Sequence, residues 1–163
     1  MSLYLIAIML ILSLCVPARA QDEMSVEEDP IDKSVGACID KDSAPNAIVA
    51  CFSQGHRQWD AEVTKLYNEL LGKLDNDKKE TLKTAQAQWA QYRDSELRFI
   101  DALYAGEDHP AHAPLRADQR MQLIRSRALA LHEYLASLEE LAASENAEEN
   151  DKDAAEDEPK EVK

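Results

Sequence analysis

Two histidines and an arginine near the middle of the chain are the side chains best suited to contact another molecule. His109, His112 and Arg116 lie in or directly after a segment with two prolines, and their nitrogen atoms can donate hydrogen bonds to an anionic group. The two histidines could supply half of a metal site, but no further ligands cluster near them. We therefore predict a protruding loop that contacts a protein partner, with no metal and no cofactor. An ordinary connector between helices is the simpler alternative.

The sequence lacks the residue combinations typical of catalysis. No nucleophile–base pattern is evident, and the four glycines do not form a phosphate-binding loop. We therefore predict that the protein is not an enzyme and has no catalytic residues.

Charged residues stand beside the apolar faces of two predicted helices. Asp60 follows Trp59, and Arg93 is followed by Asp94. An unpaired buried charge costs roughly 3–5 kcal/mol, so we predict that Asp60 and Arg93 pair between helices. Asp94 and Arg127 are assigned to the same structural charge network. An exposed recognition patch is the alternative interpretation.

The elements that must position these residues are three long helices, predicted from apolar residues at 3–4 spacing. They run from about 45 to 74, from 77 to the glycine at 106, and from 115 to 143. The short link between the first two makes them antiparallel neighbours. The predicted fold is therefore all-α, an antiparallel bundle of three long helices. Four aromatic residues fall on the apolar stripes and are predicted in the core: Trp59, Tyr67, Trp89 and Tyr92.

The first 20 residues have the features of an export signal. An apolar run from Leu3 to Leu14 is followed by Ala18-Arg19-Ala20, the small-x-small pattern that signal peptidase cleaves after Ala20. A retained anchor and lipidation at Cys15 are the alternatives. We therefore predict a periplasmic or secreted protein without membrane contact after cleavage.

Acidic residues dominate both ends of the remaining chain. The whole sequence holds 32 acidic and 18 basic residues, and the segments 21–33 and 144–163 carry net charges of −5 and −6. Such segments bury too little apolar surface to offset the entropy of ordering, so 21–37 and 144–163 are predicted to be disordered around a domain at 38–143. The negative charge argues against nucleic acid or anionic lipid and favours a basic protein partner. Solubility is the simpler explanation of the tails.

Two cysteines remain after the predicted cleavage. Cys38 and Cys51 are 13 residues apart, and in an oxidising compartment they would most simply form a disulfide that ties an N-terminal loop to the first long helix. A loop of this size would contribute about 3 kcal/mol through the unfolded state. Two free thiols are the alternative.

A motif in the second helix resembles the LprI-type lysozyme inhibitor family. Residues 85–94 read Ala-Gln-x-x-Trp-x-x-Tyr-Arg-Asp, and the resemblance extends over about 38–135. Family members often carry a third cysteine where this chain has Leu97, and a fourth that is also missing here. The resemblance therefore implies that the first two cysteines form a separate bridge and that packing of Leu97 replaces a covalent tie. The residues that carry the resemblance are Cys38, Cys51, Trp59, Asp60, Tyr67, Leu82, Ala85, Gln86, Trp89, Tyr92, Arg93, Asp94 and Arg127.

The resemblance implies an exported bacterial protein that inhibits lysozyme. Lysozymes cut with two carboxylates in a cleft, and a loop with His109, His112 and Arg116 could occlude that cleft. Most lysozymes are basic, so an acidic binder would be steered toward them. The alternative is a structural or adaptor module of the bacterial cell envelope that contacts another envelope protein.

Overall fold

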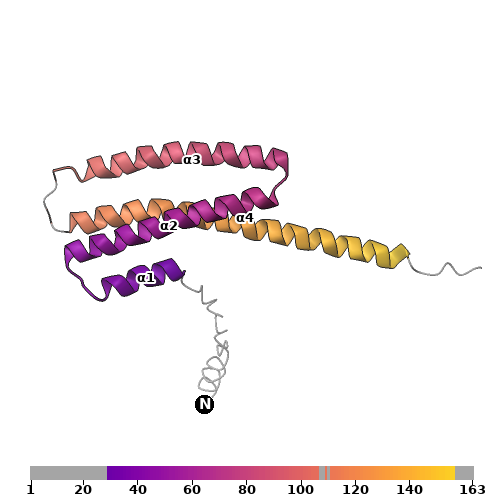
Figure 1. Ribbon diagram of the computed structural model, residues 1–163, viewed down its shortest axis with the longest axis horizontal. Helices are drawn as coiled ribbons and strands as arrows, with labels where there is room; N and C mark the ends of the chain where they lie inside the picture. The colour runs from indigo at the N-terminus through magenta and orange to yellow at the C-terminus, as the bar shows by residue number, and fades with distance from the viewer. Residues whose placement is uncertain (1–28, 107–108, 110, 157–163) are drawn as a thin grey trace, which may run out of the picture.

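The computed structural model describes residues 29–106, 109 and 111–156. In this part of the chain it contains four helices and no strand: α1 (Pro30–Ile39), α2 (Pro45–Lys73), α3 (Asn76–Leu103) and α4 (His112–Glu156) (Figure 1). The all-α class is confirmed, but the helices number four where three were predicted. The predicted signal peptide, its cleavage after Ala20 and residues 21–28 and 157–163 lie outside the described residues. No described helix is long and apolar enough to cross a membrane.

Helix α1 occupies a segment that the sequence had indicated to be disordered. The side chain of Asp29 accepts a hydrogen bond of 2.7 Å from the amide of Ile31, and Pro30 suits the first turn. Val35 is buried against the core. The expected disulfide between Cys38 and Cys51 is present. It joins α1 to α2, so it ties two helices together, whereas a loop had been predicted at the first cysteine.

The core lies mainly between α2 and α4, which run side by side in the same direction (Figure 1). Apolar residues on one face of each helix repeat at 3–4 spacing and meet along the contact. Trp59 and Ile124 are almost fully enclosed, at 1% and 0% exposure. The buried cluster consists of Val35, Trp59, Val63, Leu66, Leu70, Met121, Ile124, Ala128, Leu131 and Leu135.

A glycine allows α1, α2 and α4 to approach one another closely. Gly55 is buried in α2, and a Cβ atom placed there would lie 2.5 Å from Met121 Sδ and 2.6 Å from Val35 Cγ2. Both distances are too short for a real Cβ contact, so the lack of a side chain at this position permits the three-helix crossing.

Helix α3 packs less closely than α2. It begins one residue earlier than predicted, because the side chain of Asp75 caps it by accepting a 2.9 Å hydrogen bond from the amide of Lys78. Ile100 is its one buried residue. Leu97, expected to pack in place of a cysteine, is partly buried. Helix α3 contacts α4 more than α2, which leaves part of its apolar face uncovered.

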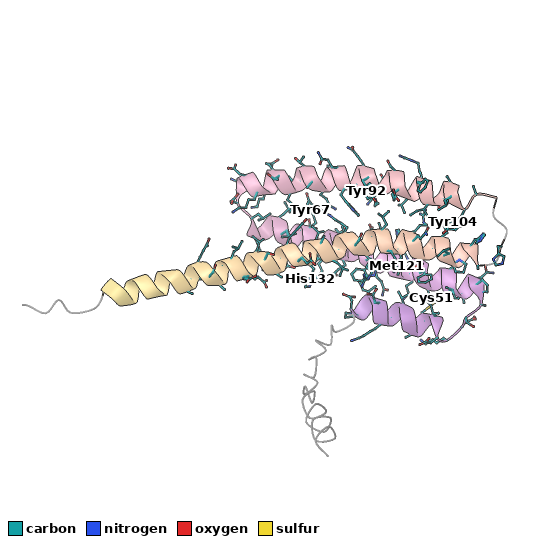
Figure 2. The ribbon with its side chains drawn as sticks, turned by 180° about the vertical axis from the view of Figure 1, so that it is seen from behind. Cys51, Tyr67, Tyr92, Tyr104, Met121 and His132 are labelled. Atoms are coloured by element: carbon teal, nitrogen blue, oxygen red, sulfur yellow. A yellow bond between two sulfur atoms is a disulfide. The ribbon has the colours of Figure 1, made fainter. Side chains whose placement is uncertain are left out.

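The prediction that all four aromatic residues lie in the core is wrong for one of them. Trp59 is buried, and Tyr67 and Trp89 pack at the edge of the core. Tyr92 lies on α3 (Figure 2). Its side chain is 54% exposed. The apolar face of α3 is broader than the surface that α4 offers to cover it.

Helix α4 is longer than predicted and projects beyond the other helices (Figure 1). Its 45 residues include 144–156, in the segment that the sequence had indicated to be a disordered tail. At 1.5 Å per residue it spans about 67 Å, whereas the 29 residues of α2 span about 44 Å. The acidic C-terminal part of the helix therefore extends away from the bundle.

Candidate functional site

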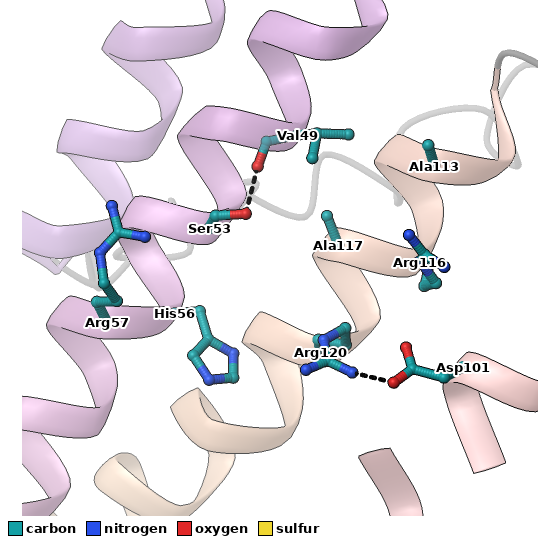
Figure 3. Close-up of a pocket in the computed structure, with 9 residues that line it drawn as sticks. All are labelled: Val49, Ser53, His56, Arg57, Asp101, Ala113, Arg116, Ala117 and Arg120. Atoms are coloured by element: carbon teal, nitrogen blue, oxygen red, sulfur yellow. Dashed lines mark hydrogen bonds and ion pairs between the residues drawn. The ribbon is translucent and has the colours of Figure 1, made fainter. Parts of the chain in front are cut away.

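A pocket of about 440 Å³ lies at the end of the bundle where α2 and α4 begin (Figure 3). Four nitrogen-bearing side chains line it: His56 and Arg57 from α2, and Arg116 and Arg120 from α4. Asp101 from α3 is the one acidic residue in the lining, which is completed by Val49, Ser53, Ala113 and Ala117. We call these nine residues the basic pocket. It is a local concentration of positive charge on a chain whose net charge is −14.

The arginine side chains of the basic pocket differ in the hydrogen bonds and ion pairs that they form with other described residues. Arg120 donates a 2.7 Å hydrogen bond to Asp101, an ion pair that joins α4 to α3. Arg57 and Arg116 are exposed, and neither forms a hydrogen bond or ion pair within the described residues. Their guanidinium groups are therefore available to an anionic partner.

His56 lies deeper in the same pocket and is partly buried. Burial lowers the pKa of His56 below its ordinary value of 6.5, and the positive charge of Arg120 acts in the same direction. A hydrogen bond with the backbone of Arg120 and, more weakly, the carboxylate of Asp60 raise the pKa of His56 and so oppose this shift. His56 therefore loses its proton more readily than a solvated histidine.

The three residues predicted to form a partner-binding loop lie at this end of the bundle. His109 is exposed in the connection between α3 and α4, and its Nδ1 accepts a 3.2 Å hydrogen bond from the amide of Ala111. His112 is the first residue of α4, with its ring 5.2 Å from that of His109. Arg116 follows one turn later and lines the basic pocket. The structure thus brings Arg116 next to residues of α2, while the two histidines are not among the residues that line the basic pocket.

The residues of the predicted charge network are partly exposed, and they do not form the close interhelical ion pairs that were predicted. Arg93 lies 4.0 Å from Asp60 on α2 but donates to its own neighbour, Asp94, at 2.8–2.9 Å. The two carboxylates are about half exposed. Arg127 binds no carboxylate in the described part of the chain. Its guanidinium donates to the side-chain oxygen of Gln86 at 3.0 and 2.8 Å.

Trp89 is the centre around which the motif residues gather. The guanidinium groups of Arg93 and Arg127 lie 5.2 and 5.7 Å from the Trp89 ring, within the range of cation–π attraction. Gln86 sits one turn before Trp89 and holds Arg127 in place. Gln86 and Trp89 of the motif therefore join α3 to α4 through Arg127.

Sequence reasoning missed two sets of residues. Asp32 and Arg125 form an ion pair between α1 and α4, which could not be anticipated while α1 was expected to be disordered. His56, Arg57 and Arg120 were not recognised as neighbours of Arg116, because α2 and α4 are separated by about forty residues of sequence. The spacing on α4 was a usable signal, because Arg116 and Arg120 are four residues apart and therefore share a helix face.

Within the described residues no group of three or more histidine, cysteine, aspartate or glutamate side chains could hold a metal ion.

Comparison with known proteins gives a match over most of this fold. The family model described as "Lysozyme inhibitor LprI" matches residues 38–131, more than half of the chain. Among solved structures, the chain is similar to the crystal structure of an uncharacterized protein from Burkholderia thailandensis, with a TM-score of 0.65 and 27% identity. The alignment covers 69% of this chain and 57% of that one, so the match spans little more than half of that protein. A search of curated proteins gave no match.

Proposed function

Because the chain belongs to the LprI lysozyme inhibitor family, we propose that it is an exported protein that inhibits lysozyme-like peptidoglycan hydrolases by occluding their cleft. The observation that carries this proposal is the basic pocket at the end of an otherwise acidic molecule. In this proposal the chain performs no chemistry and acts as a binding protein in the periplasm or outside the cell.

The chemistry of the target explains why a basic end suits this role. Glycoside hydrolases of the lysozyme type place two carboxyl groups on either side of the scissile bond. A guanidinium group presents several donors in a planar fork that matches a carboxylate. Arg57 and Arg116 are exposed and form no ion pair within the described residues, so binding to an acidic cleft would break no ion pair there.

The remainder of the molecule supports encounter with a basic enzyme. The net charge of −14 attracts a positively charged lysozyme over long range. The basic pocket then acts at short range, where the local charge of the enzyme cleft is negative. This combination predicts fast association that slows as salt screens the long-range attraction.

Lysis of peptidoglycan by a panel of animal-type and bacterial lysozymes, with increasing inhibitor at two salt concentrations, tests the proposal. We expect stoichiometric inhibition that weakens with salt. The double variant Arg57→Ala/Arg116→Ala should raise the inhibitory concentration by about 10- to 100-fold, as expected for central charged contacts.

Arg98→Ala is the matched control, because Arg98 is an exposed arginine of α3 that does not line the basic pocket. It removes one positive charge and should change inhibition less than twofold. Inhibition by the double variant equal to that of the unmodified protein would exclude the basic pocket as the inhibitory surface. The lack of inhibition of every lysozyme would instead favour an adaptor of the cell envelope.

A further inference from the structure

An apolar strip on the outer side of α3 is separate from the basic pocket. Its exposed members are Tyr92, Phe99 and Leu103 on α3, at 54%, 60% and 54% exposure. We call these three residues the α3 strip. At 100° per residue, Tyr92 and Phe99 point about opposite to Asp101, which lines the basic pocket. The α3 strip and the basic pocket therefore lie on different sides of α3.

The α3 strip borders a groove that can accept side chains from another helix. The groove has a volume of about 420 Å³ and lies between α3 and α4, with Ile100 and Leu123 among its lining residues. Tyr92, Phe99 and Leu103 follow one another at intervals of seven and four residues. This is the spacing of helices that pack side by side, with residues of one helix inserted between residues of the other.

Helix α3 is incompletely covered by the other described residues of a single copy. It has 28 residues but buries one, whereas the 29 residues of α2 bury six. Contiguous exposed apolar residues of this kind mark an interaction surface in proteins. Tyr92 also belongs to the motif over residues 85–94, yet more than half of its surface is exposed.

The surroundings of the α3 strip indicate which partner covers it. Along the outer border of α3, Gln88, Ser95 and Ala102 repeat at intervals of seven and are all exposed. On α4, Gln119 and Gln122 line the groove, and Glu96 is its one charged residue. This nearly uncharged surface belongs to a chain with 50 charged residues among 163.

The scarcity of charged residues around the α3 strip favours a second copy of the chain over a charged protein as its partner. A basic partner would gain little at the α3 strip, because Glu96 is the one acidic residue that lines its groove. Two copies, each with a net charge of −14, repel one another, and the repulsion is least where the facing surfaces are uncharged. We propose that two copies of the chain associate through the α3 strip, with their α3 helices antiparallel about a two-fold axis.

Light scattering and sedimentation of the purified protein over a range of concentrations test this proposal. We expect a dimer whose dissociation constant falls as salt rises, because salt screens repulsion between the two acidic copies. The double variant Phe99→Glu/Leu103→Glu should raise the dissociation constant by about 100-fold or more, because it places unpaired carboxylates in an apolar contact. Tyr92→Glu, at the other end of the α3 strip, is a second variant with the same expected direction.

Leu141→Glu is the matched control, since Leu141 is 59% exposed on α4 and lies outside the α3 strip. It adds one negative charge, as Tyr92→Glu does, and should leave the dimer intact, while circular dichroism reports whether each variant keeps its helices. A protein that stays monomeric at all concentrations would overturn the proposal. So would a dimer that resists both α3 variants, or one that Leu141→Glu also dissociates.

Discussion

Arg125 on α4 and Asp32 on α1 form an ion pair, in which Arg125 Nε donates at 3.1 and 2.8 Å to the two carboxylate oxygens and Nη2 lies 2.6 Å from Oδ2. The guanidinium also lies 5.6 Å from the ring of the buried Trp59. Asp32 raises the pKa of Arg125 through this hydrogen bonding. The pair fixes α1 over the core of α2 and α4, together with the disulfide between Cys38 and Cys51.

Removing one member of this pair should destabilise the fold. Asp32→Asn leaves the partly buried guanidinium without its charged partner, and we expect a loss of about 1–2 kcal/mol in the free energy of unfolding. Urea denaturation measures this quantity. Glu62→Gln serves as the control because Glu62 pairs with Lys65, whose side chain is 66% exposed, and such a pair contributes about 0–1 kcal/mol. Equal losses for the two variants would contradict the structural role of Asp32.

Replacing each of two glycines of α2 by alanine should change the stability of the fold in opposite directions. Gly55→Ala adds a methyl group that would overlap Met121 and Val35, and we expect a net loss of about 1–2 kcal/mol because overpacking exceeds the gain in helix propensity. Gly72 has nothing within 4 Å of its hypothetical Cβ, so Gly72→Ala should stabilise by about 0.5–1 kcal/mol. Thermal denaturation compares the two, and stabilisation by Gly55→Ala would show that the helices do not cross so closely.

Burial of His56 predicts a stability that depends on pH. The folded pKa of His56 lies below its ordinary value of 6.5, so below that pH the unfolded chain binds a proton more readily than the folded one. The stability associated with neutral His56 is therefore present above about pH 6.5 and is lost as the pH falls through the folded pKa.

The variant His56→Gln isolates this contribution from that of other titrating groups. Between about pH 7.5 and about pH 5.5, the unmodified protein should lose more unfolding free energy than His56→Gln does. Urea denaturation at several pH values provides the comparison. Parallel curves for the two proteins would show that His56 is not held in its neutral form.

The contact of Arg127 with Gln86 and Trp89 depends on the shape of a guanidinium group. Lysine keeps the charge but cannot donate in a planar fork or stack on the Trp89 ring in the same way, so Arg127→Lys should lose about 1 kcal/mol of stability. Arg98→Lys, at an exposed position on the same bundle, should change stability by less than about 0.5 kcal/mol. A neutral effect of Arg127→Lys in chemical denaturation would argue against the fork as the important feature.

The regular spacing of apolar residues made the three long helices predictable from sequence. The 3–4 spacing of apolar residues located α2, α3 and most of α4, and the cysteine spacing predicted the disulfide. Helix α1 escaped detection because its ten residues are set in an acidic segment and bury one residue, Val35. The extension of α4 was missed because its composition is that of a polar tail.

The candidate site was less predictable because it depends on how helices face one another. Arg116 was identified from its own neighbourhood, but Arg57 joins it only through the parallel alignment of α2 and α4. Asp60 and Arg93 were expected to form a tight pair, yet α3 packs mainly on α4 and the two side chains remain 4.0 Å apart. Tyr92 shows the same limit, since periodicity assigns a residue to a face but does not reveal whether a neighbour covers that face.

Occlusion of the lysozyme cleft by the basic pocket can be tested by competition with a ligand of that cleft. Binding of the purified protein to a lysozyme that it inhibits would be measured by calorimetry, first alone and then with a saturating chitin trisaccharide. If the basic pocket enters the cleft, the apparent affinity should fall in proportion to occupancy by the sugar. A complex that forms with unchanged affinity while the cleft is filled would contradict occlusion and place the binding surface elsewhere on the enzyme.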